Sequence, residues 1–332
     1  MASAVVLAAP PVNGVQRVEL ENGYYLLARP SEPSADAPLP LMVCLHGTDD
    51  SAEDILTFWR SLTANLPYVF VAPQGSRAGW RESDLPLLRE MLEHVRRNVV
   101  FDPQRVLLTG HSAGGPMAFR LLYVEHFPAT AVAVTANYLP PSITSEQVRG
   151  RAEVPVFYAV GTYDLNQERM REGAALLREA GVRLTMRRPR IGHVLDRGVG
   201  QEALQWSERL CRDEVQALID RARDYKGPEG AAGLLAADLE NVLRYSQTHF
   251  HDQVPLVREA LDRLEAPGRA LLARAQDLAD AHKYPEAYAL YVRLERDYRP
   301  AALAEVARAR RLKLEGEPAA AAATAAPKVD SE

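Results

Sequence analysis

The stretch Arg105-Val106-Leu107-Leu108-Thr109-Gly110-His111-Ser112-Ala113-Gly114-Gly115-Pro116 decides how this chain is interpreted. Its beginning, Arg105–Thr109, is a short and mostly apolar run, which is typical of a strand covered on both faces in a parallel sheet. A glycine-rich turn follows, and Pro116–Phe127 has the pattern of a helix. The sequence therefore predicts a strand, a sharp turn and a helix, with Ser112 at the turn.

Ser112 has the sequence surroundings of an activated nucleophile. In the pattern G-x-S-x-G, glycines two residues before and two residues after the serine leave space for a strained turn. The following helix offers free N–H groups that favour negative charge developing near the serine hydroxyl. The alternative is an ordinary glycine-rich turn whose serine only caps the helix. Because the pentapeptide is weak evidence alone, the prediction of a nucleophile depends on the flanking strand and helix.

The rest of the N-terminal two thirds alternates between strands and helices. A hairpin is predicted from Val15–Leu20 and Tyr24–Arg29, which are joined by a turn containing Asn22-Gly23. Further strands are predicted at Leu41–His46, Tyr68–Pro73, Ala131–Ala136, Val154–Val160 and Val182–Arg187. Helices are predicted at Ala52–Asn65 after the N-cap Ser51, at Leu85–Asn98 after Ser83, at Gln167–Ala180 before Gly181, and from Gly198 to about Leu210. This alternation predicts the α/β class with a doubly wound, mostly parallel sheet.

An acid and a base for Ser112 occur downstream in the required order. A serine hydroxyl needs an imidazole to take its proton and a carboxylate to orient that imidazole. Asp164 follows the predicted strand Val154–Val160, and His193 follows the strand Val182–Arg187, so both lie at the sheet edge where Ser112 lies. We predict a triad of Ser112, Asp164 and His193.

Other acids and histidines fit this arrangement less well. Asp196 is only three residues from the histidine, and Asp102 precedes the nucleophile strand. His111 is next to the nucleophile, and we expect its side chain to point away. The remaining histidines fall in or near predicted helices, in the C-terminal part of the chain, or in the loop that begins His46-Gly47, where His46 is expected to brace the loop.

These motifs together resemble a known family. The set His46-Gly47, Gly110–Gly114, Gly161–Asp164 and Gly192-His193 resembles the carboxylesterase and phospholipase-like branch of the α/β-hydrolases over roughly residues 15 to 210. The run Ala72–Ser76, followed by Gly79-Trp80, is similar to a loop in polyhydroxyalkanoate depolymerase-like and feruloyl-esterase-like serine esterases. The resemblance implies an α/β-hydrolase fold and ester hydrolysis through an acyl-enzyme, with no metal or cofactor.

The same resemblance implies where the oxyanion and substrate are bound. In such hydrolases the residue after the nucleophile and the loop after an earlier strand supply the backbone N–H groups of the oxyanion hole. Here these are Ala113 and Thr48, with Gly47 as the next choice. Only seventeen residues separate Ala136 from Val154, which is too short for a large lid, and an open cleft is expected. Trp80 and Tyr138 are expected to form apolar substrate-binding walls, although Trp80 serves equally well as core packing.

The composition changes near Cys211, where predicted strands cease. We expect a flexible N-terminus at 1–14, a catalytic domain at 15–211, an all-helical appendage at 212–315 and a disordered tail at 316–332. Helices are expected at Asp213–Tyr225, Leu234–Tyr245 and Leu256–Leu264, with breaks at Lys226–Gly233 and Ala266–Gly268. The positions Ala275, Leu278, Tyr284, Ala287 and Tyr291, followed by Pro300, resemble a single tetratricopeptide helix pair. A generic helical bundle explains them equally well.

Overall composition limits the classes of function. The 332 residues carry 39 Lys and Arg against 44 Asp and Glu, a net charge of −5, so no basic face for nucleic acid is expected. The two cysteines do not form a disulfide framework, and no apolar stretch is long enough to span a bilayer. Met1–Val12 is rich in small apolar residues but lacks a basic region, which favours a cytoplasmic location over a remnant export signal.

The expected function is hydrolysis of small-molecule esters with short or medium acyl chains. Two alternatives stay open at the level of sequence. A peptidase of the same fold would use the same triad. A non-enzymatic scaffold would instead bind a protein partner through the helical C-terminal region, but the complete set of Ser112, Asp164 and His193 argues against it.

Overall fold

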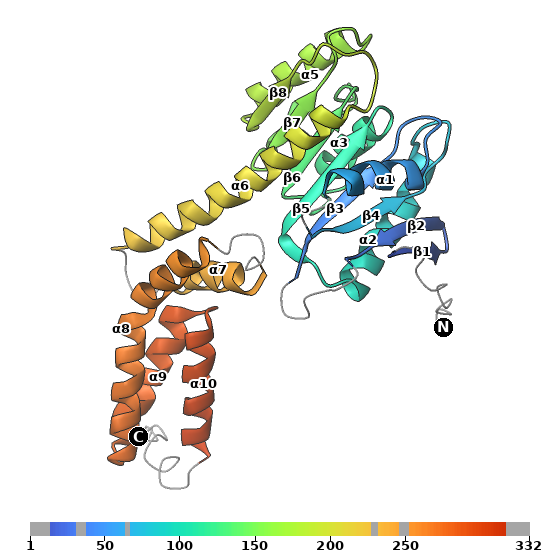
Figure 1. Cartoon of the computed structure of the whole chain (residues 1–332). Coiled ribbons are helices and arrows are strands. Elements are labelled where there is room, and N and C mark those ends of the chain that lie inside the picture. The colour runs from blue at the N-terminus through green and yellow to red at the C-terminus, as the bar shows by residue number, and fades with distance from the viewer. Residues whose placement is uncertain (1–13, 31–37, 64–66, 227–231, 246–251, 317–332) are drawn as a thin grey trace, which may run out of the picture. The chain divides into compact units, whose positions relative to one another are not determined.

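The computed structural model describes residues 14–30, 38–63, 67–226, 232–245 and 252–316. It divides into two compact units, residues 1–211 and 212–332. The first unit is built on one eight-stranded sheet, and the second consists of helices (Figure 1). The predicted α/β class with a mostly parallel sheet and a helical C-terminal region is confirmed.

The strands of the sheet lie in the order β1-β2-β4-β3-β5-β6-β7-β8. Strands β1 and β2 form the predicted hairpin, in which Leu20 pairs with Gly23, and β2 pairs antiparallel with β4. All remaining neighbours are parallel, so the carboxyl ends of β3 to β8 meet at one edge. The bounds are β1 Val15–Leu20, β2 Gly23–Ala28, β3 Pro40–Leu45, β4 Val69–Pro73, β5 Asp102–His111, β6 Ala131–Thr135, β7 Val156–Ala159 and β8 Leu184–Arg187.

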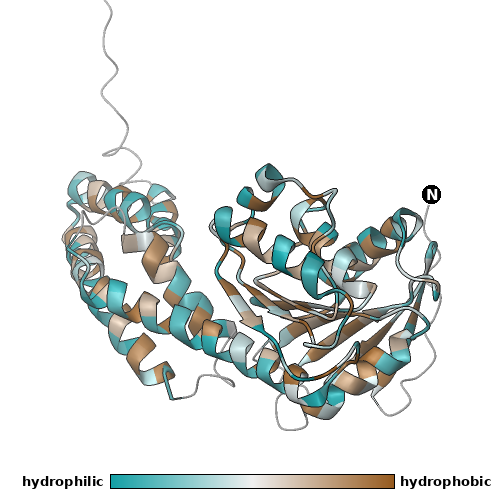
Figure 2. Cartoon of the chain, turned by 90° about the horizontal axis from the view of Figure 1, so that it is seen from above, coloured by the Kyte–Doolittle hydropathy of each residue, from teal (hydrophilic) through white to brown (hydrophobic). Residues whose placement is uncertain are grey.

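Helices cover both faces of the sheet, which explains why the central strands are apolar throughout. One face packs against α2 (Leu85–Asn98), α3 (Gly114–Tyr123) and α5 (Gln167–Glu179). The other packs against α1 (Ala52–Leu62) and the first half of α6 (Arg197–Arg223). Alternate residues of one strand therefore enter different cores. In Figure 2 the strands are mostly brown, which marks hydrophobic residues, whereas the helices carry both hydrophobic and hydrophilic residues.

The helix starts show which capping predictions hold. Ser51 caps α1 in a capping box with Asp54, as predicted. Ser83 does not cap α2, because the short 3-10 turn η1 (Glu82–Asp84) intervenes and places Asp84 at the N-cap.

The segment between β6 and β7 contains only the five-residue helix α4 (Ser145–Arg149), so it holds no large lid.

The C-terminal helices, from α6 onwards, are longer than the sequence suggests. The two helices predicted at Gly198 to about Leu210 and at Asp213–Tyr225 form one continuous helix, α6, of 27 residues, so their separation is wrong. The predicted break at Ala266–Gly268 is also wrong, because α8 (Val254–Asp280) runs through Pro267. The other helices are α7 (Ala232–Tyr245), α9 (Tyr284–Tyr298) and α10 (Ala302–Glu315).

The side chains of Ala275, Ala287 and Tyr291 are buried in this helical unit. That burial fits a generic bundle as well as a repeat, so the tetratricopeptide interpretation stays a prediction. The expected flexible N-terminus and disordered tail lie outside the described residues, apart from Gly14 and Gly316 at their inner ends. Across the ranges that the structure describes, no helix is both long and apolar enough to cross a membrane.

Candidate active site

Ser112 lies at a sharp turn between β5 and α3. Its backbone has φ of +48°, a left-handed conformation that is costly for a residue with a side chain. The glycines around it are sterically required. A β-carbon on Gly110 would lie 2.3 Å from the carbonyl oxygen of Gly114, and one on Gly114 would lie 2.4 Å from the carbonyl oxygen of Leu45. The predicted strand, turn and helix are therefore present, with the helix beginning two residues after Ser112.

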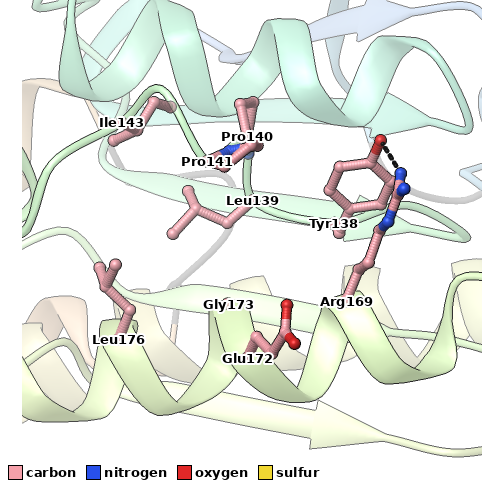
Figure 3. A pocket seen from close by; sticks show the side chains of 9 residues that line it. All are labelled: Tyr138, Leu139, Pro140, Pro141, Ile143, Arg169, Glu172, Gly173 and Leu176. Carbon is pink, nitrogen blue, oxygen red and sulfur yellow. Dashed lines mark hydrogen bonds between the residues drawn. The ribbon is translucent and has the colours of Figure 1, made fainter.

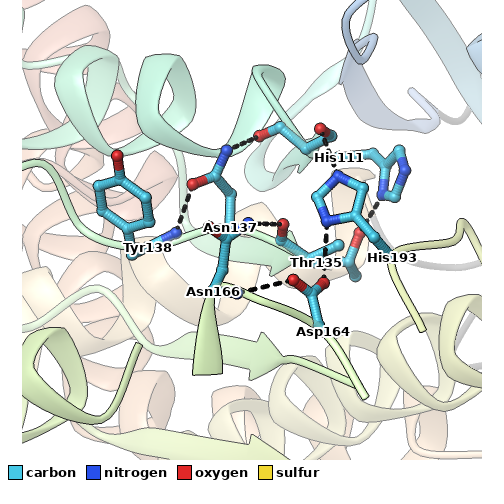
Figure 4. Close-up of polar contacts among 9 residues, drawn as sticks. His111, Thr135, Asn137, Tyr138, Asp164, Asn166 and His193 are labelled. Carbon is cyan, nitrogen blue, oxygen red and sulfur yellow. Dashed lines mark hydrogen bonds and ion pairs between the residues drawn. The ribbon is translucent and has the colours of Figure 1, made fainter. Parts of the chain in front are cut away.

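Ser112, His193 and Asp164 form a connected chain of hydrogen bonds. The Ser112 hydroxyl lies 2.7 Å from Nε2 of His193, and Nδ1 of His193 lies 2.9 Å from Oδ2 of Asp164. The Asp164 side chain is fully buried, whereas that of His193 is 43% exposed. Figure 4 shows His193 above Asp164, at the carboxyl ends of the strands. This is the geometry in which an imidazole accepts the serine proton and a carboxylate fixes the imidazole tautomer.

The loops that carry the acid and the histidine are bound to each other. The N–H of Thr162 donates to the carbonyl of Pro189 over 2.8 Å, and the N–H of Tyr163 donates to Ile191 over 3.0 Å. Gly161 permits this close approach, because a β-carbon there would lie 2.1 Å from the Ile191 carbonyl oxygen. The two loops thus hold Asp164 next to His193.

The rival acids have structural contacts elsewhere. Asp102 forms a buried ion pair with Arg105, with 2.6 Å between Oδ2 and Nε. Asp196 accepts the backbone N–H of Val199 over 2.9 Å at the start of α6. Neither is bonded to His193.

The three residues predicted for the oxyanion hole lie around Ser112. A β-carbon on Gly47 would lie 3.3 Å from the Ser112 β-carbon, and one on Gly79 would lie 3.3 Å from Thr48 Oγ1 and 3.5 Å from the Ala113 β-carbon. Thr48 and Ala113 therefore approach each other across Gly79. Within the part of the chain that the structure describes, the backbone N–H groups of Thr48 and Ala113 donate to no other residue.

His46 braces the loop that carries Gly47 and Thr48, as expected from the sequence. It is fully buried, and its Nε2 accepts the N–H of Gly75 over 3.1 Å. Its Nδ1 therefore carries the proton and donates to the carbonyl of Gly47 over 2.7 Å. Trp80 also fixes the start of this loop, because its indole N–H donates to the His46 carbonyl over 2.9 Å.

His111 does not point away from the site as predicted. Its ring centroid lies 5.9 Å from that of His193, and its Nδ1 lies 3.0 Å from the hydroxyl of Thr135 (Figure 4). Burial, reinforced by the nearby His193, lowers the pKa of His111 to about 4. His111 is therefore a neutral neighbour of His193 at neutral pH.

Two asparagines contribute to the site without having been predicted. Asn137 donates from its side chain to the Ser112 carbonyl over 2.9 Å, and Asn166 donates from its side chain to the Ala136 carbonyl over 3.1 Å. The backbone N–H of Asn166 also donates to Oδ1 of Asp164 over 2.9 Å. Their positions after β6 and β7 were the only signal in the sequence.

The two predicted wall residues line different cavities. Trp80 and Ala113 line a cavity of about 300 Å³, here called the Ala113 cavity, with further apolar walls from Pro116, Met117, Pro140 and Ile143. Tyr138 lines a separate cavity of about 440 Å³ between the segment after β6 and α5. There its hydroxyl accepts a hydrogen bond from Arg169 over 2.7 Å (Figure 3). Only Trp80 thus shares a cavity with a predicted oxyanion residue.

Within the described ranges, no group of three or more His, Cys, Asp or Glu side chains is arranged to hold a metal ion.

No protein-family model matches the sequence, and no curated protein matches it. The structure is similar to S-formylglutathione hydrolase from Staphylococcus aureus, with a TM-score of 0.50 and 11% identity over 58% of this chain and 94% of that chain. It is also similar to a carboxylesterase from Mesorhizobium loti, with a TM-score of 0.48 and 14% identity over 57% of this chain and 97% of that chain. A third similar structure is a thermostable esterase, with a TM-score of 0.47 and 18% identity over 59% of this chain and 62%, less than two thirds, of that chain.

The first of these likenesses, taken with the strand order and the turn at Ser112, identifies the fold. Residues of the first unit adopt the α/β-hydrolase fold.

Proposed function

We propose that this protein is a serine hydrolase that cleaves carboxylic esters through an acyl-enzyme intermediate. The observation that carries the proposal is the chain of hydrogen bonds of 2.7 Å and 2.9 Å that links Ser112, His193 and Asp164 at a strained turn. A bare capping serine needs neither the left-handed backbone nor a histidine oriented by a buried carboxylate.

Acylation begins when Ser112 Oγ attacks the ester carbonyl carbon and its proton moves to Nε2 of His193. Asp164 stays ionised and stabilises the resulting imidazolium. The tetrahedral intermediate then collapses, the carbon–oxygen bond to the alcohol breaks, and His193 returns the proton to the departing oxygen. Water repeats the sequence on the acyl-serine, which releases the carboxylic acid and restores the Ser112 hydroxyl.

The negative oxygen of each intermediate is bound by the backbone N–H groups of Thr48 and Ala113 in this proposal. Both groups lack partners among the described residues, and Ala113 stands at the N-cap of α3. Donors fixed in advance stabilise the charge as it develops without reorganisation. His46 and Trp80 support this arrangement by holding the loop that carries Thr48.

Short or medium acyl chains suit the room beside Ala113. If each non-hydrogen atom needs about 30 Å³, the share of a water molecule in the liquid, the cavity of about 300 Å³ holds roughly ten atoms. The segment between β6 and β7 adds no large lid that would enclose a long lipid.

A panel of p-nitrophenyl esters from acetate to octanoate tests this function. We expect hydrolysis of at least one ester, and a loss of at least about a thousandfold in kcat for Ser112→Ala. Peptide p-nitroanilides measured in parallel separate esterase from peptidase activity. The proposal would be contradicted if the wild-type protein hydrolysed none of the esters in the panel. Cleavage of the anilides alone would favour a peptidase.

A further inference from the structure

The Ala113 cavity has a polar part beyond its apolar walls. Its charged lining side chains are Arg81, Glu82 and Arg120, which leaves one positive charge in excess, and Gln147 and Ser142 add neutral polar groups. A largely apolar cavity that also offers positive charge suits a ligand with an apolar chain and a negatively charged group.

The chemistry of the proposed reaction indicates which part of an ester enters this cavity. In the tetrahedral intermediate the oxyanion faces the N–H groups of Thr48 and Ala113, and the departing oxygen faces Nε2 of His193, which protonates it. The acyl chain takes the remaining direction. The cavity is lined by Ala113 and by none of the described residues in the loops of Asp164 and His193, so it lies on the acyl side.

Arg120 lies at a distance that an acyl chain of moderate length can reach. It is seven residues after Ala113 in α3, which corresponds to about 10 Å along the helix. Side chains of a helix lean towards its N-terminus, which shortens that distance. Because an extended chain advances roughly 1.2 Å per bond, an acyl group of about six carbons reaches about 6 Å, and the Arg120 side chain, which leans towards the N-terminus of α3, covers the remainder.

The guanidinium of Arg120 is paired with an exposed carboxylate. Its Nη1 lies 2.9 Å from Oε1 of Glu82, but the Glu82 side chain is 79% exposed. The Arg120 Nε is buried, has no hydrogen-bond partner among the described residues and lies 3.9 Å from the carboxylate of Glu125, which Arg89 binds over 2.6 Å. A further carboxylate would therefore bind the terminal Nη atoms, where it replaces Glu82. Exposed ion pairs contribute little to stability, so Glu82 is a replaceable partner.

We propose that the Ala113 cavity binds the acyl chain and that Arg120 binds a carboxylate at the far end of that chain. The preferred substrates are then monoesters of dicarboxylic acids of about six carbons. Arginine suits this role because its planar guanidinium binds a carboxylate through two parallel hydrogen bonds. A carboxylate already held by its ester end also competes with Glu82 at a high effective concentration. This inference rests on the proposed esterase function.

Two esters of equal chain length test the inference. We expect a kcat/KM for mono-p-nitrophenyl adipate that is at least about five times that for p-nitrophenyl hexanoate, because only the adipate carries the carboxylate. Arg120→Gln keeps most of the side-chain stem and should lower the adipate value at least about tenfold while changing the hexanoate value less than about twofold. Glu82→Gln removes the competing carboxylate and should raise the adipate value.

The control is Arg97→Gln, which removes another arginine from an exposed ion pair on α2 and should change neither ester. The Glu82→Gln variant keeps the inference testable if Arg120→Gln fails to fold. A wild-type protein without a preference for the adipate, or equal losses on both esters in Arg120→Gln, would overturn the role of Arg120. Failure to hydrolyse either ester would instead count against the proposed esterase function.

Discussion

At the residue scale, side-chain amides outside the proposed triad hold its geometry. Asn137 fixes the carbonyl of Ser112, and Asn166 links the backbone after β6 to the carboxylate of Asp164. Ser112 and Asp164, the proposed nucleophile and acid, follow different strands, and these bonds keep the separation between their two turns constant. Asn137 and Asn166 are therefore positioning residues in this account, since they act through Ser112 and Asp164.

The buried imidazole of His111 predicts how stability depends on pH. Its pKa in the folded protein is lowered to about 4 from the ordinary value of 6.5. Between these values the unfolded chain binds a proton that the folded protein does not, so stability falls as pH decreases from 6.5 towards 4. Above pH 6.5 both states are neutral and the effect disappears.

We therefore expect the wild-type protein to lose about 2 kcal/mol more free energy of unfolding between pH 7.5 and pH 5 than the variant His111→Gln. Urea unfolding at both pH values measures this difference. Other groups, including His94 with its lowered pKa, occur in both proteins and cancel in the comparison. Equal losses in the two proteins would show that His111 is not held neutral by burial.

The three residues of the proposed triad were easier to predict from the sequence than the residues that hold them in place. Ser112, Asp164 and His193 follow three strands of the sheet in a required order, and the structure brings them together. Their chemical roles stay predictions. Asn137, Asn166 and the approach of His111 to His193 were missed because such contacts depend on distances between turns that no spacing in the sequence encodes.

At the element scale, the site depends on how closely the turns after parallel strands approach one another. The turn after β7 and the loop after β8 meet at Gly161, where a β-carbon would lie 2.1 Å from the Ile191 carbonyl oxygen. Backbone atoms cannot move aside as a flexible side chain can. A larger residue at this point must displace the loop that carries His193.

We expect Gly161→Ala to lower kcat/KM for p-nitrophenyl butyrate at least about tenfold, because small misplacements of a catalytic group cost large factors in rate. Its melting temperature should also fall. Gly192→Ala is the matched control in the same loop pair, since a β-carbon on Gly192 would have no neighbour within 4 Å among the described residues. Wild-type activity in Gly161→Ala would contradict the close approach of the two loops.

Element boundaries were predictable where a local signal marks them. Ser51 with Asp54 begins α1, and α2 has the predicted range Leu85–Asn98. The helices predicted before and after Cys211 are one helix, and no glycine or proline occurs from 201 to 226 to interrupt α6. Gly268 in α8 serves packing instead of ending a helix, because a β-carbon there would lie 2.6 Å from side-chain atoms of Tyr298 and Leu303.

At the scale of the whole molecule, the chemistry is proposed for the first unit alone. All residues of the proposed triad, the oxyanion hole and the Ala113 cavity lie before Cys211, within the α/β-hydrolase fold. The sequence predicted this fold because alternating strands and helices and the turn at Ser112 are local features. In the helical unit the main contacts join consecutive helices, α7 with α8, α8 with α9 and α9 with α10, and the sequence pattern does not specify how these helices pack.

The central claim is that Ser112 is an activated nucleophile in the intact chain, and covalent labelling with a fluorophosphonate tests it most directly. The wild-type protein should be labelled on the peptide that contains Ser112, because the probe reacts with a serine whose proton is taken by a neighbouring base. Ser112→Ala should not be labelled, and His193→Ala should be labelled far more slowly. Equal labelling of the wild-type protein and Ser112→Ala would contradict the account.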